Sequence, residues 1–516
     1  MSKKFIIIIV ILIICFTAAN GETIKEGSIA GQPIIAVELG YTLEPGNDEN
    51  ILTWNKARER LLKLKEYGVN TIFLWAPYEH PQIPIKTIPV WKERNGKAIK
   101  VNKRVAQWNV VNLHAKNYLK TDPRRGTEED FQEFINEAHR LGMVVIGQFI
   151  ATGVSPESLF CQEHPEWLLR KKIGGQEYPV MTWPMNWGYA VNKSDPEFIK
   201  YVTDTVMPYW INKWNLDGIF IDSPGMPYNE SEVRAKYEPV KLSRAMREKI
   251  EAMKKETGRN LILIAENPDG SHLPKTAGIY YDFVWGYESV RAFFQVKTGS
   301  VNSNQYITAL KKEIEGRCKF TKIARFICNL NAAGKCLELL RPQWVPCYIT
   351  LNVTAPGNIV WVGVPQWDIN YDEKWCEFFL DRLGIKYKPG EAIEKVKQEV
   401  IDIDLIWGWY EKIVKIKREH PALQSDNIED ALVSPKIKRL IAYNRWLIDE
   451  SLTVIVNADK KELDCIIKTR SSGNKVILKD LLSGEEITGN PEALKVRMPG
   501  YGTRILSQDK VFREGI

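Results

Sequence analysis

Short apolar runs alternate with amphipathic stretches along the chain from residue 33 onward. The runs have the length of buried strands, and the stretches between them repeat their apolar residues with a helical period. Eight such strand–helix repeats predict an α/β fold, a parallel (β/α)8 TIM barrel rather than an open sheet. The predicted strands are 33–40, 69–77, 144–150, 217–222, 261–266, 280–285, 323–329 and 358–363.

The clearest helix is predicted over residues 127–142. Thr127 is placed to cap its first turn, acidic residues follow, and Gly142 ends it. Its single apolar face is made by Phe131, Phe134, Ile135, Ala138 and Leu141.

Two predicted loops are much longer than is usual between barrel elements. One covers about residues 80–125, after the second strand, and the other is an inserted, domain-like loop over 151–195, after the third. Both start at the strand ends where barrel enzymes build their sites. The second loop contains "YPVMTWPMNWGY", with Trp183 and Trp187, so we expect a deep cleft with an aromatic wall for an extended ligand.

The pattern changes near residue 425. The amphipathic segment 404–423 predicts the last barrel helix, and short alternating strands with turn residues follow it. We therefore expect a barrel over 22–424 and a C-terminal all-β sandwich domain over 428–516.

Residues 1–21 have a basic start, an apolar run and then small residues, which is the pattern of a secretory signal peptide. They predict a secreted or extracytoplasmic protein, with an uncleaved N-terminal anchor as the alternative. The net charge of +7 is small for 516 residues, and no lysine or arginine block predicts a nucleic-acid surface. The seven cysteines after the leader match no zinc pattern, and buried free thiols, alone or with one or two disulfides, are the favoured interpretation.

The candidate chemistry lies at two strand ends. Asp222 closes the strand 217–222 and Glu266 closes the next one, 261–266. Adjacent strands lie about 4.8 Å apart, so the two carboxyl groups can approach the separation used by retaining glycosidases. We expect about 5–7 Å between them. The alternative is that each acid only caps a helix or faces solvent.

Several stretches resemble the α-amylase family of glycoside hydrolases, family 13. They are "GTEEDFQEFINEAHRLGMVVI", "SDPEFIKYVTDTVMPYWINKWNLDGIFID", "YITLNVTAPGNIVWVG", "WYEKIVKIKREHPAL", "YGVNTIFLWAPYEHP" and "MPGYGTRIL". The resemblance extends over nearly the whole chain after the leader. It implies that Asp222 is the nucleophile and Glu266 the general acid/base.

The rest of the family's polar site is replaced at five of seven positions, by Gln148, Gly153, Phe220, Leu330 and Asn331. Phe220 stands where the family has an arginine that keeps the nucleophile ionised, so burial is expected to raise the pKa of Asp222. Thr152 replaces an asparagine that binds a structural calcium in many relatives, so we predict no metal and no cofactor. The resemblance assigns the third catalytic position to Asn331. The residues that we expect to contact the substrate are Phe220, Gln148, Trp183, Trp187, Asn329 and Trp75.

Three functions remain open. The first is a retaining hydrolase or transglycosylase of α-glucosidic oligo- or polysaccharides, weak or altered in specificity, in which another acid could substitute for a lost one: Glu79, Asp269, Glu288 or Glu338. The second is a non-catalytic carbohydrate-binding protein at the cell surface. The third is an interaction scaffold, which would need the N-terminal segment as a membrane anchor.

Overall fold

Eight parallel strands form a closed barrel in the computed structural model, in the order β14-β15-β16-β17-β18-β3-β4-β9. The TIM barrel predicted from the repeats is therefore confirmed. The strands are β3 (Ile35–Leu39), β4 (Thr71–Leu74), β9 (Val144–Ile150), β14 (Gly218–Asp222), β15 (Ile262–Ala265), β16 (Phe283–Gly286), β17 (Lys322–Phe326) and β18 (Ile359–Val362). The structure describes residues 28–29, 32–33, 35–39, 52–66, 68–81, 87–104, 115–182, 188–225, 237–266, 280–286, 288–315, 322–326, 339, 341–357, 359–362, 376–377, 380–381, 385–399, 402–433, 437–471 and 473–508. The leader, 1–21, lies outside them.

Helices surround the barrel. The predicted first turn of α3 is confirmed: the Asp130 N–H donates to Thr127 Oγ1 at 3.1 Å, and the Thr127 N–H donates to Asp130 Oδ2 at 2.8 Å. Such a reciprocal cap satisfies two helix N–H groups that would otherwise lack partners. The helices are α2 (Trp54–Glu66), α3 (Glu128–Arg140), α5 (Pro196–Tyr201) with two π-helical turns (Val202–Val206 and Tyr209–Lys213), α7 (Val240–Thr257), α8 (Glu288–Thr298), α9 (Ser303–Glu315), α11 (Val345–Thr354), α13 (Ala392–Glu399) and α14 (Ile403–Glu419).

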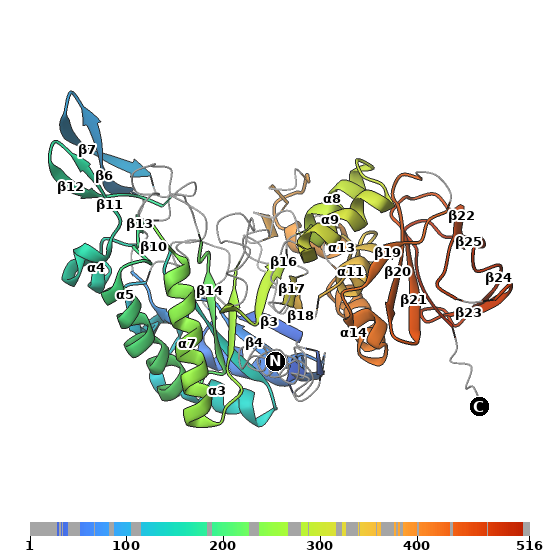
Figure 1. The fold of residues 1–516 in the computed structure, drawn as a ribbon, viewed down its shortest axis with the longest axis horizontal. Coiled ribbons are helices and arrows are strands. Elements are labelled where there is room, and N and C mark those ends of the chain that lie inside the picture. Colours follow the sequence, from blue (N-terminus) through green and yellow to red (C-terminus); the bar gives the residue numbers. More distant parts are fainter. Residues whose placement is uncertain are drawn as a thin grey trace, which may run out of the picture.

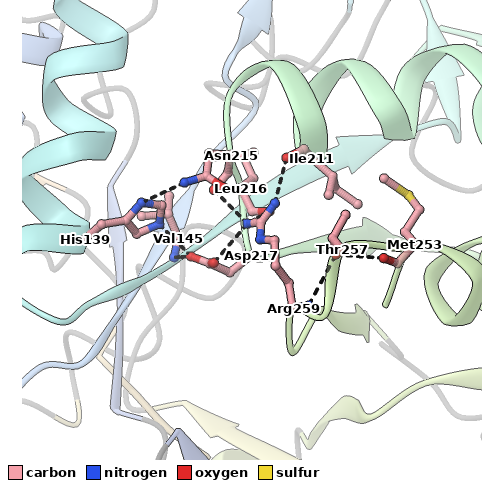
Figure 2. A network of polar contacts seen from close by, with 9 residues as sticks. All are labelled: His139, Val145, Ile211, Asn215, Leu216, Asp217, Met253, Thr257 and Arg259. Carbon is pink, nitrogen blue, oxygen red and sulfur yellow. Dashed lines mark hydrogen bonds and ion pairs between the residues drawn. The ribbon is translucent and has the colours of Figure 1, made fainter. Parts of the chain in front are cut away.

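The N-terminal end of β14 is fixed by a polar network around Asp217 (Figure 2). Its Oδ2 accepts hydrogen bonds from the Val145 N–H at 2.8 Å and contacts His139 Nε2 at 2.9 Å, while Arg259 donates to Oδ1 at 3.1 Å. Arg259 also binds three backbone carbonyls before the strand, including that of Leu216 at 2.8 Å. The network joins α3, β9 and the end of α7 to the start of β14, so the strand enters the barrel in a fixed position.

Both long loops contain antiparallel hairpins. Two of them, in residues 87–104 and 170–179, project from the barrel, away from the C-terminal domain (Figure 1). The hairpins are built from β5 (Tyr78–Glu79) with β8 (Asn117–Thr121), β6 (Thr87–Arg94) with β7 (Lys97–Arg104), β10 (Gly153–Val154) with β13 (Tyr189–Ala190), and β11 (Arg170–Ile173) with β12 (Gln176–Pro179). A short helix, α4 (Leu159–Glu163), lies beside them. The loop after the third strand is thus a small inserted subdomain.

The C-terminal domain has two antiparallel sheets, as predicted. One is ordered β19-β20-β21-β26-β23-β24, and the other pairs β22 with β25. Buried side chains from both sheets, including Ile455 and Val496, share one apolar cluster, which makes the domain a sandwich. The strands are β19 (Ile428–Asp430), β20 (Leu440–Leu447), β21 (Glu450–Asn457), β22 (Leu463–Ile467), β23 (Val476–Asp480), β24 (Glu486–Gly489), β25 (Leu494–Met498) and β26 (Thr503–Gln508).

The sandwich is joined to the barrel by buried polar contacts. The hydroxyls of Tyr443 and Thr354 are 2.5 Å apart, and Arg445 binds the Thr354 carbonyl. Lys417, on α14, donates to the carbonyls of Val353 and Gly357 at 2.7 and 2.6 Å. These contacts fix α11 and α14 between the two domains.

Four cysteines fall within the described residues, Cys161, Cys347, Cys376 and Cys465, and of these Cys161, Cys347 and Cys465 are free thiols. Cys318, Cys328 and Cys336 lie outside these residues. None of the helices that the structure describes is both long enough and apolar enough to cross a membrane.

Candidate active site

Asp222 and Glu266 lie side by side at the C-terminal ends of two adjacent barrel strands. Asp222 is the last residue of β14, and Glu266 directly follows β15, whose Ala265 pairs with Ile221. Both side chains are buried, with exposed fractions of 3% and 2%. The two acids singled out from the sequence are therefore brought together at the mouth of the barrel.

The turn after β14 holds Glu266 in place. Ser223 donates to Glu266 Oε2 twice, from its backbone N–H at 3.1 Å and from its hydroxyl at 2.7 Å. It does so with a φ of +40°, a left-handed conformation that costs a non-glycine residue about 1 kcal/mol or more. The strained conformation of Ser223 thus lets both its backbone N–H and its hydroxyl donate to Glu266 Oε2.

Burial raises the pKa of Asp222 well above its ordinary value. The negative charge of Glu266 raises this pKa further, whereas Ser223 and Lys193 lower it. The direction is the one expected from the sequence.

Lys193 supplies a buried positive charge to this pair. Its ammonium donates to the carbonyls of Ser223 and Pro224 at 2.8 and 3.1 Å and to Thr152 Oγ1 at 3.1 Å. Burial lowers the pKa of Lys193 from 10.5 to about 7, and the charges of Asp222 and Glu266 oppose that decrease. The side chain has no exposed surface. A cation from the inserted subdomain therefore fixes the turn that carries Asp222 and Ser223.

Gln148, from β9, links Asp222 to the second strand. Its Nε2 donates to Asp222 Oδ2 at 3.3 Å, and its Oε1 accepts from the Ala76 N–H at 3.0 Å. Thr152 donates to the carbonyls of Asp222 and Ser223 at 3.2 and 3.1 Å. Gln148 and Thr152 thus contact Asp222 through an amide and a hydroxyl that carry no charge.

The ring of Phe220 belongs to an apolar layer. It stacks on Trp285 with ring centroids 4.6 Å apart and meets the edge of Phe73 at 5.7 Å. All three rings are buried. The position where the resemblance expects an arginine is therefore occupied by packed aromatic rings, which offer no hydrogen bond to a carboxylate.

The other predicted residues divide into two groups. Trp75 is buried, and Gly153 pairs with Ala190 in the inserted subdomain. Among the possible substitute acids, Glu79 pairs with Lys116 at 3.2 Å and Glu288 with Arg291 at 3.2 Å. Neither contact connects these acids to Asp222. The remaining predicted residues lie outside the described part of the chain: Trp183, Trp187, Asn329, Leu330, Asn331, Asp269 and Glu338.

The position of Thr152 does not fit the calcium that the family resemblance implies. Its hydroxyl, with the carbonyls of Ser223 and Pro224, already surrounds the Lys193 ammonium. A metal cation there would meet a positive charge in place of an oxygen ligand. Within the described ranges, no group of three or more histidine, cysteine, aspartate or glutamate side chains could hold a metal ion.

Sequence reasoning did not identify Lys193 or Ser223. Lys193 lies in "VNKSDPEF", where nothing in the local pattern separates it from an exposed lysine before a helix. Ser223 directly follows Asp222, and that adjacency was the one available signal. The structure shows that both residues contact the site.

Comparisons with known proteins show where this architecture recurs. No family model matches the chain. A curated relative, the alpha-1,4-glucan:maltose-1-phosphate maltosyltransferase 1 of Streptomyces coelicolor, is 22% identical over 351 residues, which is 66% of this chain and 46% of that protein. The chain thus spans about half the length of this relative.

Solved structures match over almost the whole chain. A noncanonic maltogenic alpha-amylase from Thermotoga neapolitana superposes with a TM-score of 0.64 at 18% identity, covering 92% of this chain and 98% of that one. Alpha-amylases from Lactobacillus plantarum and Geobacillus thermoleovorans give TM-scores of 0.63 and 0.62 at 16% and 14% identity, with the same coverage. The resemblance seen in the sequence is confirmed, and the chain has the fold of the α-amylase family of glycoside hydrolases.

Proposed function

We propose that this protein is a retaining glycoside hydrolase or transglycosylase that acts on α-glucosidic oligo- or polysaccharides. The observation that carries the proposal is the buried pair of Asp222 and Glu266 at adjacent strand ends, with Lys193 beside it. The substrate class is supported by the proteins that the chain resembles, which are described as α-amylases and as a maltosyltransferase on α-1,4-glucan.

The raised pKa of Asp222 suggests how the pair would enter the reaction. Burial and the charge of Glu266 raise the pKa of Asp222, which favours the protonated form of Asp222 in the resting protein. Transfer of that proton to Glu266 would leave Asp222 ionised and Glu266 protonated. These are the states that a nucleophile and a general acid need. Asp222 would then attack the anomeric carbon while Glu266 protonates the departing oxygen, and Glu266 would later activate the water or acceptor hydroxyl.

Lys193 and Ser223 would act as positioning residues. The Lys193 charge favours the ionised form of Asp222 and therefore takes over part of the role of the arginine that Phe220 replaces. Ser223 orients the Glu266 carboxyl group through its two hydrogen bonds to Oε2. Each positioned electrostatic contact in a transition state contributes about 3–4 kcal/mol. With several of the family's contacts replaced, we expect turnover well below that of an ordinary amylase.

The test is hydrolysis of an activated α-glucoside and of maltooligosaccharides by three variants. Asp222→Asn and Glu266→Gln should each abolish activity and leave the melting temperature at or above that of the parent, because a neutral amide replaces a buried acid. Glu79→Gln, a buried acid paired with Lys116 away from this pair, is the matched control and should keep full activity. Residual activity shared equally by the parent and the two site variants would refute the proposal.

A second function is favoured by one observation. The acid pair is almost fully buried, and an aromatic layer fills the place of a charged residue. This is also what a non-catalytic carbohydrate-binding protein or scaffold would show. In that case, Asp222→Asn and Glu266→Gln would keep their affinity for acarbose and maltooligosaccharides within a few-fold, and neither they nor the parent would hydrolyse a glucoside.

We also infer that the protein is exported, from the signal-peptide pattern of residues 1–21. Sequencing the N-terminus of the protein isolated from its producing cells tests this. A mature protein that begins near residue 22 supports export with cleavage. An intact leader in the membrane fraction supports the anchored scaffold.

A further inference from the structure

The positive charge of the chain is concentrated in two hairpins of the long loops. We call residues 87–104 and 170–179 the hairpin unit. It contains nine lysines and arginines and two glutamates, a net charge of +7. The whole chain also has a formal net charge of +7, so acidic and basic residues balance in all the rest of the molecule.

The two hairpins are held together as one unit. Trp91 on β6 stacks on Tyr178 on β12, with ring centroids 5.3 Å apart and ring planes 28° apart. Their turns touch, since a Cβ on Gly174 would lie 2.7 Å from the Gly96 carbonyl oxygen. Figure 1 shows the unit extending from the barrel into solvent. Charges that are about 70 residues apart in the sequence are therefore neighbours in space.

One face of the β6–β7 hairpin carries cations and no acid. Alternation along paired strands puts Lys92, Arg94, Lys97 and Lys103 on the same face, because Lys92 pairs with Ile99, Arg94 with Lys97, and Ile88 with Lys103. All four side chains are exposed. In the parts of the chain that the structure describes, no ion pair involves any of them. At about 3.4 Å per residue, the row from Lys97 to Lys103 is about 20 Å long.

We propose that this face of the hairpin unit binds an anionic polysaccharide. A row of unpaired cations about 20 Å long complements a linear polymer with regularly spaced negative charges better than it complements one small anion. The long loops that carry the unit start at the C-terminal ends of β4 and β9, on the side of the barrel where Asp222 and Glu266 lie. The choice of a polysaccharide over another polyanion rests on the proposed carbohydrate function, whereas the binding itself does not require catalysis.

Two other polyanions fit the face less well. Single-stranded nucleic acid binds where bases stack on aromatic rings, and the apolar residues on this face are Ile99 and Val101, with Ile88 and Val90 buried beneath its base. A membrane-binding hairpin needs apolar residues at its tip, and this tip reads Arg94–Asn95–Gly96–Lys97. The face therefore offers charge without base stacking or insertion into lipid.

The experiment measures binding of the full-length protein to polygalacturonate, with neutral dextran of similar length as the uncharged comparison. Neutralising the face by replacing Lys92, Arg94, Lys97 and Lys103 with glutamine should weaken binding by about tenfold or more at low salt and flatten its salt dependence. The matched control removes four exposed lysines of the C-terminal domain, Lys460, Lys475, Lys479 and Lys495, and should leave affinity within about twofold. Because all the replaced side chains are exposed, both variants should keep the parent's melting temperature.

Three outcomes would overturn the proposal. They are equal weakening by the control variant, equal binding of dextran, and tighter binding of single-stranded DNA or phosphatidylglycerol vesicles than of polygalacturonate. Asp222→Asn separates this proposal from the catalytic one. This variant should bind polygalacturonate as tightly as the parent does. If the parent binds polygalacturonate through the face but shows no glycosidase activity, only the proposed function is refuted.

Discussion

Replacing Lys193 with methionine removes a buried charge that the inserted subdomain places beside the acid pair. Methionine keeps much of the lysine stem volume but cannot donate to Thr152 or to the carbonyls of Ser223 and Pro224. A buried carbonyl without a donor costs about 1–3 kcal/mol. Lys417→Met is the matched control, because Lys417 is equally buried and also donates to three backbone carbonyls, at the domain junction and not at the site.

Activity should distinguish the two variants. The charge of Lys193 lowers the pKa of Asp222, so its removal should raise that pKa further, by about 1–3 pH units for a close buried cation. The acidic limb of kcat/KM on an activated glucoside should move to higher pH by that amount in Lys193→Met and stay in place in Lys417→Met. An NMR titration of the labelled Asp222 carboxyl reports the same change if turnover is slow. An unmoved limb in Lys193→Met, or the same displacement in both variants, would refute the assigned role.

Stability should respond to pH in a way that follows from the lysine itself. Its pKa falls from 10.5 in the unfolded chain to about 7 in the folded one. At about 1.4 kcal/mol for each pH unit, the difference corresponds to ~5 kcal/mol. Between these values the unfolded chain holds a proton that the folded chain has lost, so this lysine makes the parent's stability rise as pH rises from about 7 to 10.5. Urea unfolding at both ends of this window should show that Lys193→Met lacks the increase.

Three further predictions concern individual contacts. Ser223→Ala should destabilise the fold by about 1–3 kcal/mol and lower kcat, since Glu266 loses a 2.7 Å hydrogen bond. Ser223→Gly should lose less stability than Ser223→Ala, because glycine adopts a φ of +40° without strain. Phe220→Ala should lower the free energy of unfolding, measured with urea, by about 3–5 kcal/mol, because it opens a cavity beside Trp285. Asp217→Ala should lower the free energy of unfolding by about 3–5 kcal/mol, because it removes the carboxylate partner of Arg259. The pH profile of activity should stay unchanged, because the network of Figure 2 lies at the opposite end of β14 from Asp222. A stability change below 0.5 kcal/mol in either of the last two variants would show that the contact contributes little.

The sequence predicted the features that depend on neighbours along the chain. The period of the apolar residues specified the strands and helices, and Thr127 with Asp130 specified the start of α3. It also predicted that Asp222 and Glu266 would be close, because parallel strands that are consecutive in a barrel end at the same face. The apolar layer around Phe220 could be anticipated in part, since side chains alternate along a strand.

The tertiary structure decided what depends on residues brought together by loops. Lys193 reaches the turn at Ser223, 30 positions away in the sequence, only because the inserted subdomain folds back over β14. The hairpin unit assembles its charge from segments that look unremarkable when each is read alone. Local periodicity fixes the conformation of a strand or helix, but it contains no information on which loop residue will be desolvated beside a distant carboxylate. For this reason the sequence by itself determined the barrel and its acid pair, whereas only the folded chain determined the charges that surround them.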